Sequence, residues 1–206
     1  MPKYWYERKR KSGRLSVYNG AGGWSKHVSK AINDFNSLPF KLLLDRETDE
    51  LKADIVVILS DGKSTSYPRD GRKINGNVIQ ANFDAAKTHG QAASFLDGKD
   101  RVMKVVIFLP DKLKNVPDDI KEMVVVHELI HAAGLVEKKD HDPTGGILYA
   151  TLQLHDGKLR EPSTDKDLKG MPPVRIGAWT HCQMNDLWKT SELDKKVEEP
   201  AEGCKI

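Results

Sequence analysis

The pentapeptide His127-Glu128-Leu129-Ile130-His131 lies inside an apolar run, VVVHELIHAAGL, and it constrains the fold more than any other segment. Residues four apart share one face of an α-helix, so the imidazoles of His127 and His131 can reach the same metal ion. Glu128 is rotated by about 100° from His127, because a helix has roughly 3.6 residues per turn. The pattern therefore predicts a zinc ion held by two histidines, with Glu128 as the general base beside a metal-bound water.

The flanking residues predict a helix over about residues 118–134. Acidic residues in DDIKEM stand at its start, where the helix dipole favours negative charge. Gly134 stands at its end, where a left-handed residue commonly terminates a helix. The competing interpretation of the same pattern is a buried amphipathic helix whose two histidines are purely structural.

Length and hydropathy indicate one domain over residues 1–206, with a basic arm at 1–14 and an acidic tail at 194–206. No apolar stretch reaches the roughly 18 residues that a membrane span requires, so no membrane partner is expected. The first residues lack the apolar core of a signal peptide. A cytoplasmic location is therefore favoured over a secreted mature form.

The basic arm holds six Lys or Arg residues against one Glu. We expect it to be a solvated, partly disordered terminus, and nucleic acid is not expected as a partner. The two cysteines, Cys182 and Cys204, are too few for a disulfide scaffold. Free thiols are expected, and the alternative is a bridge that ties the acidic tail to the last helix.

Hydrophobic periodicity predicts the remaining elements. An amphipathic helix is expected over 22–38 and a closing helix over 180–193. A long polar loop is expected at 60–76, and a hairpin at 151–159. Strands are expected at 14–20, 40–47, 53–61, 77–84 and 101–110.

Catalytic zinc sites take three protein ligands and leave a fourth position for water, so two histidines are not enough. In the order HELIHAAGLVEKKDHDP, three candidates follow Gly134: Glu137, Asp140 and His141. A glycine turn can return any of these side chains to the metal.

The segment HELIHAAG resembles the HExxHxxG motif of the metzincin clan of zinc endopeptidases, of the matrixin-like or small bacterial type. The family spacing places the third ligand at Glu137, an unusual residue type for that position. Four further residues lead to His141, which is our first choice, with Asp140 and Glu137 as alternatives. GGILY resembles the family's methionine turn, with Leu148 in place of Met and Tyr149 after it.

This resemblance implies an α+β fold with a twisted mixed sheet of about five strands, an active-site helix, a second packing helix and a C-terminal helix. It also implies one catalytic Zn²⁺ and a monomer that hydrolyses a protein or peptide substrate. The substrate would pair with an exposed edge strand, for which the matching segment is NVIQANFD. The altered ligand spacing and Leu148 support an alternative: a catalytically weak or inactive metzincin-fold protein with a binding or regulatory role.

Overall fold

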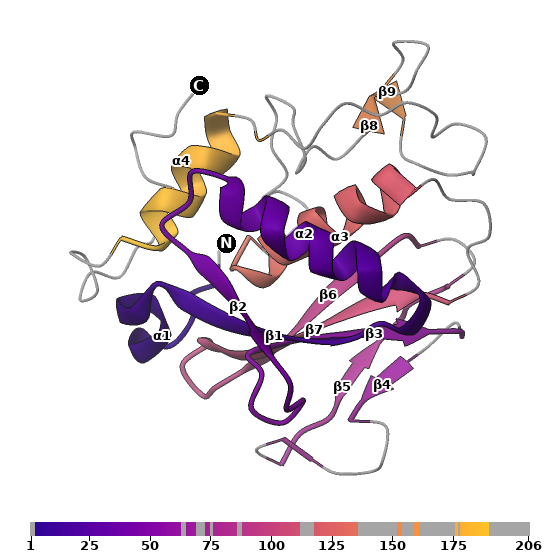
Figure 1. Ribbon diagram of the computed structural model, residues 1–206. Helices are drawn as coiled ribbons and strands as arrows, with labels where there is room; N and C mark the ends of the chain where they lie inside the picture. Colours follow the sequence, from indigo (N-terminus) through magenta and orange to yellow (C-terminus); the bar gives the residue numbers. More distant parts are fainter. Residues whose placement is uncertain are drawn as a thin grey trace.

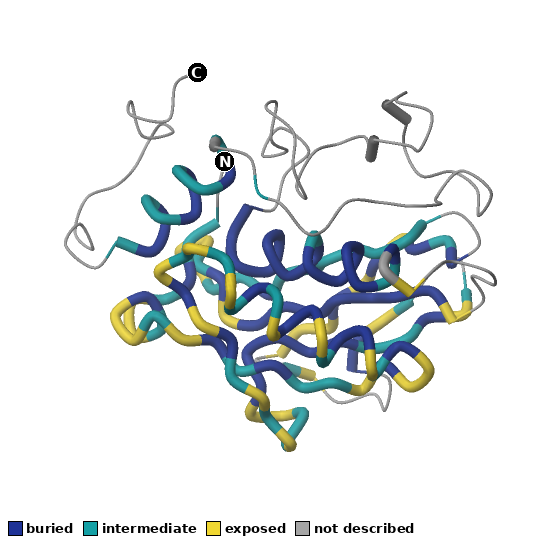
Figure 2. Tube along the Cα trace, turned by 45° about the horizontal axis from the view of Figure 1, so that its top comes forward, coloured by how far each residue is buried: buried dark blue, intermediate teal, exposed yellow. Residues whose placement is uncertain are grey.

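The structure is a computed structural model, and it describes residues 3–62, 65–68, 73–74, 76–85, 88–111, 118–135, 152–153, 159–160, 176 and 178–189. Its centre is a five-stranded sheet, with two long helices on one face and a two-stranded sheet on the other (Figure 1). Buried residues fill the space between the main sheet and the helices and the space between the main sheet and the small sheet (Figure 2). Among the described residues, no helix is both long enough and apolar enough to cross a membrane.

The main sheet has the strand order β2-β1-β3-β7-β6. Strands β2, β1, β3 and β7 run parallel to one another, whereas β6 runs antiparallel to β7 at one edge. Strand β7 is buried at every position but one, as its nearly continuous apolar sequence predicts for an interior strand. The strands are β1 (Arg14–Gly20), β2 (Leu43–Glu47), β3 (Ile55–Ser60), β6 (Gln91–Leu96) and β7 (Val102–Pro110).

Helix α2 (Ser25–Ser37), preceded by a short 3-10 turn η1 (Gly22–Trp24), packs with helix α3 (Asp118–Ala132) against one face of this sheet. The predicted apolar stripe of α2 is buried in that core: Trp24, Val28, Ile32 and Phe35. The predicted α+β class is confirmed, with a mixed five-stranded sheet and helices at each expected place. Helix α4 (Ala178–Leu187) is the expected closing helix.

The opposite face of the sheet carries a smaller core, beneath strands β4 (Thr65–Tyr67) and β5 (Ile79–Ala81). The prediction for segment 77–84 was partly wrong. Its central residues form β5, but β5 pairs with β4 and not with the main sheet. The antiparallel edge strand of the main sheet is β6, in a stretch where no strand was expected. Its sequence, QAASFL, contains mostly small or polar residues and is half-buried, so its apolar periodicity is weak.

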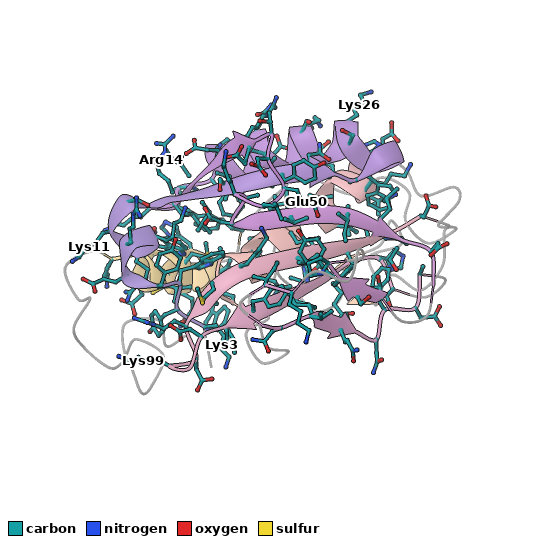
Figure 3. The ribbon with its side chains drawn as sticks, turned by 90° about the horizontal axis from the view of Figure 1, so that it is seen from below. Lys3, Lys11, Arg14, Lys26, Glu50 and Lys99 are labelled. Carbon is teal, nitrogen blue, oxygen red and sulfur yellow. The ribbon has the colours of Figure 1, made fainter. Side chains whose placement is uncertain are left out.

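The expectation of a solvated, partly disordered N-terminal arm is only partly right for the described residues 3–14, because several charged side chains are exposed but the segment joins the fold. Trp5 is only 1% exposed and bridges to Val102 of β7. The Val102 N–H donates to the Tyr4 carbonyl at 2.7 Å, which adds this segment to the sheet. Helix α1 (Glu7–Ser12) follows. The aromatic rings enter the core while charged side chains such as Lys11 and Arg14 point outward (Figure 3).

Near the C-terminus, strands β8 (Leu152–Gln153) and β9 (Leu159–Arg160) pair antiparallel, which confirms the predicted hairpin. In α4 and just after it, Leu187 and Trp188 are buried and Trp179 is partly buried. Cys182 is disulfide-bonded, so the expectation of free thiols is wrong for this residue. The chain's other cysteine, Cys204, and the acidic tail 194–206 lie outside the described residues.

Candidate metal centre on helix α3

Helix α3 is buried on nearly all sides, and among the described elements it packs against β6 and β7 of the sheet and, alongside them, against α2. A helix that is apolar around its whole circumference gains its stability from such burial. Within its described run from Ile120 to Leu135, only Lys121 and His127 are more than slightly exposed. The predicted site residues therefore sit on a rigid core element, with His127 directed toward its more open side.

The two helical histidines meet as the i, i+4 spacing predicts. The Nε2 atoms of His127 and His131 are 3.0 Å apart, and their rings lie edge to face at 76°. Two imidazole ligands of a tetrahedral zinc ion have nitrogens about 3.3 Å apart, given zinc–nitrogen bonds of about 2.0–2.1 Å. The pair thus has nearly the separation that a shared zinc ion requires. A single N–H···N hydrogen bond also fits this distance.

The other ring nitrogen of His131 identifies the tautomer that suits a metal ligand. Its Nδ1 lies against the Leu135 carbonyl, which can only accept a hydrogen bond, so Nδ1 carries the proton. In the neutral ring Nε2 then keeps its lone pair, directed toward His127. A carbonyl partner of this kind is the usual support for a histidine that binds metal.

Glu128 is directed toward strand β6 and is only 6% exposed. Burial raises the pKa of Glu128 to about 8, and a hydrogen bond from the Ala92 backbone N–H acts in the opposite direction. A carboxyl group that titrates near neutral pH is typical of groups that transfer protons. The structure places the side chain against the edge strand of the sheet, and its expected place beside a metal-bound water stays a prediction.

Helix α3 ends at Ala132, and the predicted terminating glycine, Gly134, follows two residues later. Gly134 has φ +129°, and a Cβ atom there would stand 2.5 Å from the Lys3 carbonyl oxygen and 2.6 Å from Leu187 Cδ2. Its carbonyl accepts a hydrogen bond from the Lys3 N–H at 2.8 Å. Glycine is therefore needed here both for the backbone conformation and for close packing.

Two tryptophans hold the last turn of α3. The Trp5 indole donates to the Ala132 carbonyl at 2.9 Å, and the Trp188 indole donates to the Ala133 carbonyl at 3.1 Å. These carbonyls have no partner within the helix itself, so the indoles cap its C-terminus. Sequence reasoning missed this role for both residues. The available signal was that a buried indole N–H needs an acceptor.

The third ligand stays a prediction. His141, Asp140 and Glu137 lie outside the described residues, as do Leu148 and Tyr149 of the expected turn. Within the part of the chain that the structure describes, no group of three metal-binding side chains converges. The described site consists of two imidazoles and one buried carboxylate.

Two other histidines, His27 and His181, have structural roles. His27 is buried in α2, with its Nε2 3.4 Å from Asp118 Oδ1 at the start of α3, and burial lowers the pKa of its imidazole. His181 Nε2 accepts a hydrogen bond from Asn185 Nδ2 at 2.7 Å, within α4. Neither lies with the His127–His131 pair, so neither extends the donor set.

Comparison of the chain with protein-family models and with curated proteins gave no match.

Proposed function

We propose that this protein is a zinc-dependent endopeptidase of the metzincin type. The observation that carries the proposal is the approach of His127 Nε2 to His131 Nε2 at 3.0 Å, with the buried Glu128 between them in sequence. If the two histidines were purely structural, the burial of a carboxyl group next to them would have no explanation. Burying such a group destabilises the fold, so a function is the better reason for its presence.

The donor set fits zinc. Both histidines offer Nε2, and the Leu135 carbonyl sets the tautomer of His131. His141 is the proposed third ligand, with Asp140 and Glu137 as the alternatives. A zinc ion bound here would supply Lewis-acid chemistry, which lowers the pKa of water and polarises a peptide carbonyl.

Glu128 supplies the proton transfers in this proposal. Its carboxylate takes a proton from the attacking water as general base and returns it to the leaving amine as general acid. The Ala92 N–H orients the carboxylate, and the surrounding core keeps bulk water from it. The Glu128 side chain thus extends from helix α3, and its carboxylate is bound by strand β6.

The sheet order supports a metzincin-like fold as part of this proposal. Strand β6 lies antiparallel at the edge of the sheet, directly against the helix that carries HELIH. An extended peptide can pair with an exposed edge strand, which brings its backbone close to the site. We therefore transfer the substrate-binding role from the segment NVIQANFD to β6, while protein or peptide remains the proposed substrate class.

The second candidate is a metzincin-fold binding or regulatory protein with little or no cleavage. The wider spacing from His131 to His141, and Leu148 at the expected methionine position, favour it. Both candidates bind zinc, so metal content alone does not separate them.

Zinc content and cleavage of a peptide library, measured together, test the proposal. The wild type should hold one zinc ion per chain and cleave internal peptide bonds. Glu128→Ala should keep zinc and lose cleavage by at least about 100-fold, the usual contribution of a general base. His127→Ala should lose both zinc and cleavage, whereas the control His181→Ala should lose neither. Zinc without cleavage in the wild type supports the binding protein, and absence of zinc refutes both candidates.

A further inference from the structure

We propose that Gly90 is a positioning residue for the Glu128 carboxylate. This inference rests on the proposed function for its catalytic consequence. Gly90 immediately precedes strand β6, and its backbone approaches Glu128 so closely that no side chain fits between them. A Cβ atom at Gly90 would stand 2.7 Å from Glu128 Cγ, 2.8 Å from Oε1 and 3.0 Å from Cδ. Carbon atoms in van der Waals contact are about 3.5–4.0 Å apart, so Glu128 would have to move.

The same segment also binds the carboxylate. The Ala92 N–H donates to Glu128, and Ala92 packs against the core on the helix side of the sheet. Positions 90 and 92 face the same side, because side chains alternate along an extended chain. Gly90 therefore leaves the space and Ala92 supplies the hydrogen bond, so the edge strand fixes both the location and the orientation of the carboxylate.

The contact predicts that the Glu128 side chain, and not the strand, moves when a Cβ atom is added at Gly90. Gly90 has no left-handed φ, so alanine is compatible with its backbone. The clashing atoms belong to a flexible side chain, and displacing them is easier than displacing a strand. Gly90→Ala should keep the fold and the two histidines in place while the Glu128 carboxylate leaves its hydrogen bond with Ala92.

The catalytic test compares Gly90→Ala with Gly98→Ala in the zinc-loaded full chain. A Cβ at Gly98 meets nothing within 4 Å, so this variant controls for adding a methyl group near the other end of β6. Gly90→Ala should lower kcat by about 100-fold, as a misplacement of about 1 Å does, with KM and zinc content unchanged. In the Glu128→Ala background the same substitution should have no further effect on kcat. Equal losses in both backgrounds, or loss of the fold, would overturn the positioning role.

A spectroscopic measurement tests the contact without any cleavage. In protein labelled with ¹³C at the Glu side-chain carboxyls, the Glu128 resonance is assigned by its absence from Glu128→Ala. Gly90→Ala should shift this resonance and the Ala92 amide resonance, and Gly98→Ala should leave both unchanged. If both resonances stay in place in Gly90→Ala, the inference is wrong. If they shift but the wild type cleaves no peptide, the contact holds and the proposed function is what fails.

Discussion

Replacing Trp5 with phenylalanine tests the link between the N-terminal segment and the site. The ring of Trp5 is 1% exposed, and its indole N–H caps the Ala132 carbonyl at 2.9 Å, one residue after His131. Phenylalanine keeps most of the buried apolar surface but removes the donor. A buried carbonyl left without its partner costs about 1–3 kcal/mol. The smaller ring also leaves a cavity, so we expect a total loss of about 2–4 kcal/mol.

The assay is urea and thermal unfolding followed by far-UV circular dichroism, since the substitution removes a fluorescent residue. For a chain of this size, the expected loss lowers Tm by roughly 4–16 °C. Trp188→Phe removes the matching bond to the Ala133 carbonyl and should have a similar effect. Zinc affinity should also fall in Trp5→Phe, because the indole holds the end of the helix that carries His131.

The matched control is Trp179→Phe, because Trp179 is only partly buried. Its expected loss is smaller than that of Trp5→Phe, in both stability and zinc affinity. A change below about 0.5 kcal/mol in Trp5→Phe, the range of ordinary surface substitutions, would refute the capping role. Equal losses in Trp5→Phe and Trp179→Phe would show that the indole bond to Ala132 contributes nothing specific.

Three further outcomes follow from the described residues. Gly134→Ala should lower the free energy of urea unfolding by at least about 2 kcal/mol, because of the positive φ and the close Lys3 carbonyl. The control Gly23→Ala has open space at its Cβ and should stay within about 1 kcal/mol of wild type. Hydrogen bonds from Arg101 lower the pKa of Asp97 to about 2, so Asp97 should stabilise the fold above its usual pKa and lose that effect as pH falls toward 2. Unfolding measured from pH 6 to pH 2 should therefore show a weaker acid dependence in Asp97→Asn. Burial raises the pKa of Glu122 above its usual value, against the opposing effect of Lys30, so Glu122→Gln should gain stability relative to wild type as the pH of unfolding rises above the usual pKa of a glutamate.

The elements with strong periodicity were predictable from sequence. The apolar run of β7 and the i, i+3 and i+4 stripe of α2 each match a single secondary structure, because burial requires their pattern. The meeting of His127 and His131 was also predictable, for a purely local reason. Helical geometry alone brings residues four apart together, whatever the rest of the fold does.

Pairing between distant segments was not predictable. The alternation in NVIQANFD is satisfied equally well by a small sheet with β4 as by the main sheet, and a pattern does not name its partner. QAASFL has only two large apolar residues, so its half-buried edge position leaves little signal. The basic residues around Trp5 favoured the prediction of a solvated arm, although the buried Trp5 ring anchors this segment in the core.

The contact between Gly90 and Glu128 shows the same limit within the site. The sequence places Glu128 on a helix, but the glycine that leaves room for it comes from a different layer of the fold. No local pattern distinguishes Gly90 from the other glycines in polar stretches. Such residues are found only once the helix and the edge strand are placed together.

Zinc X-ray absorption spectroscopy on the purified, zinc-loaded chain tests the central claim most directly. Zinc should be bound at one ion per chain, with imidazole nitrogens at about 2.0–2.1 Å and four ligands in total. His131→Ala should remove at least one imidazole from the spectrum or abolish binding, and Glu128→Ala should leave the nitrogen shell unchanged. A chain that binds no zinc, or a His131→Ala spectrum identical to that of the wild type, would contradict the account.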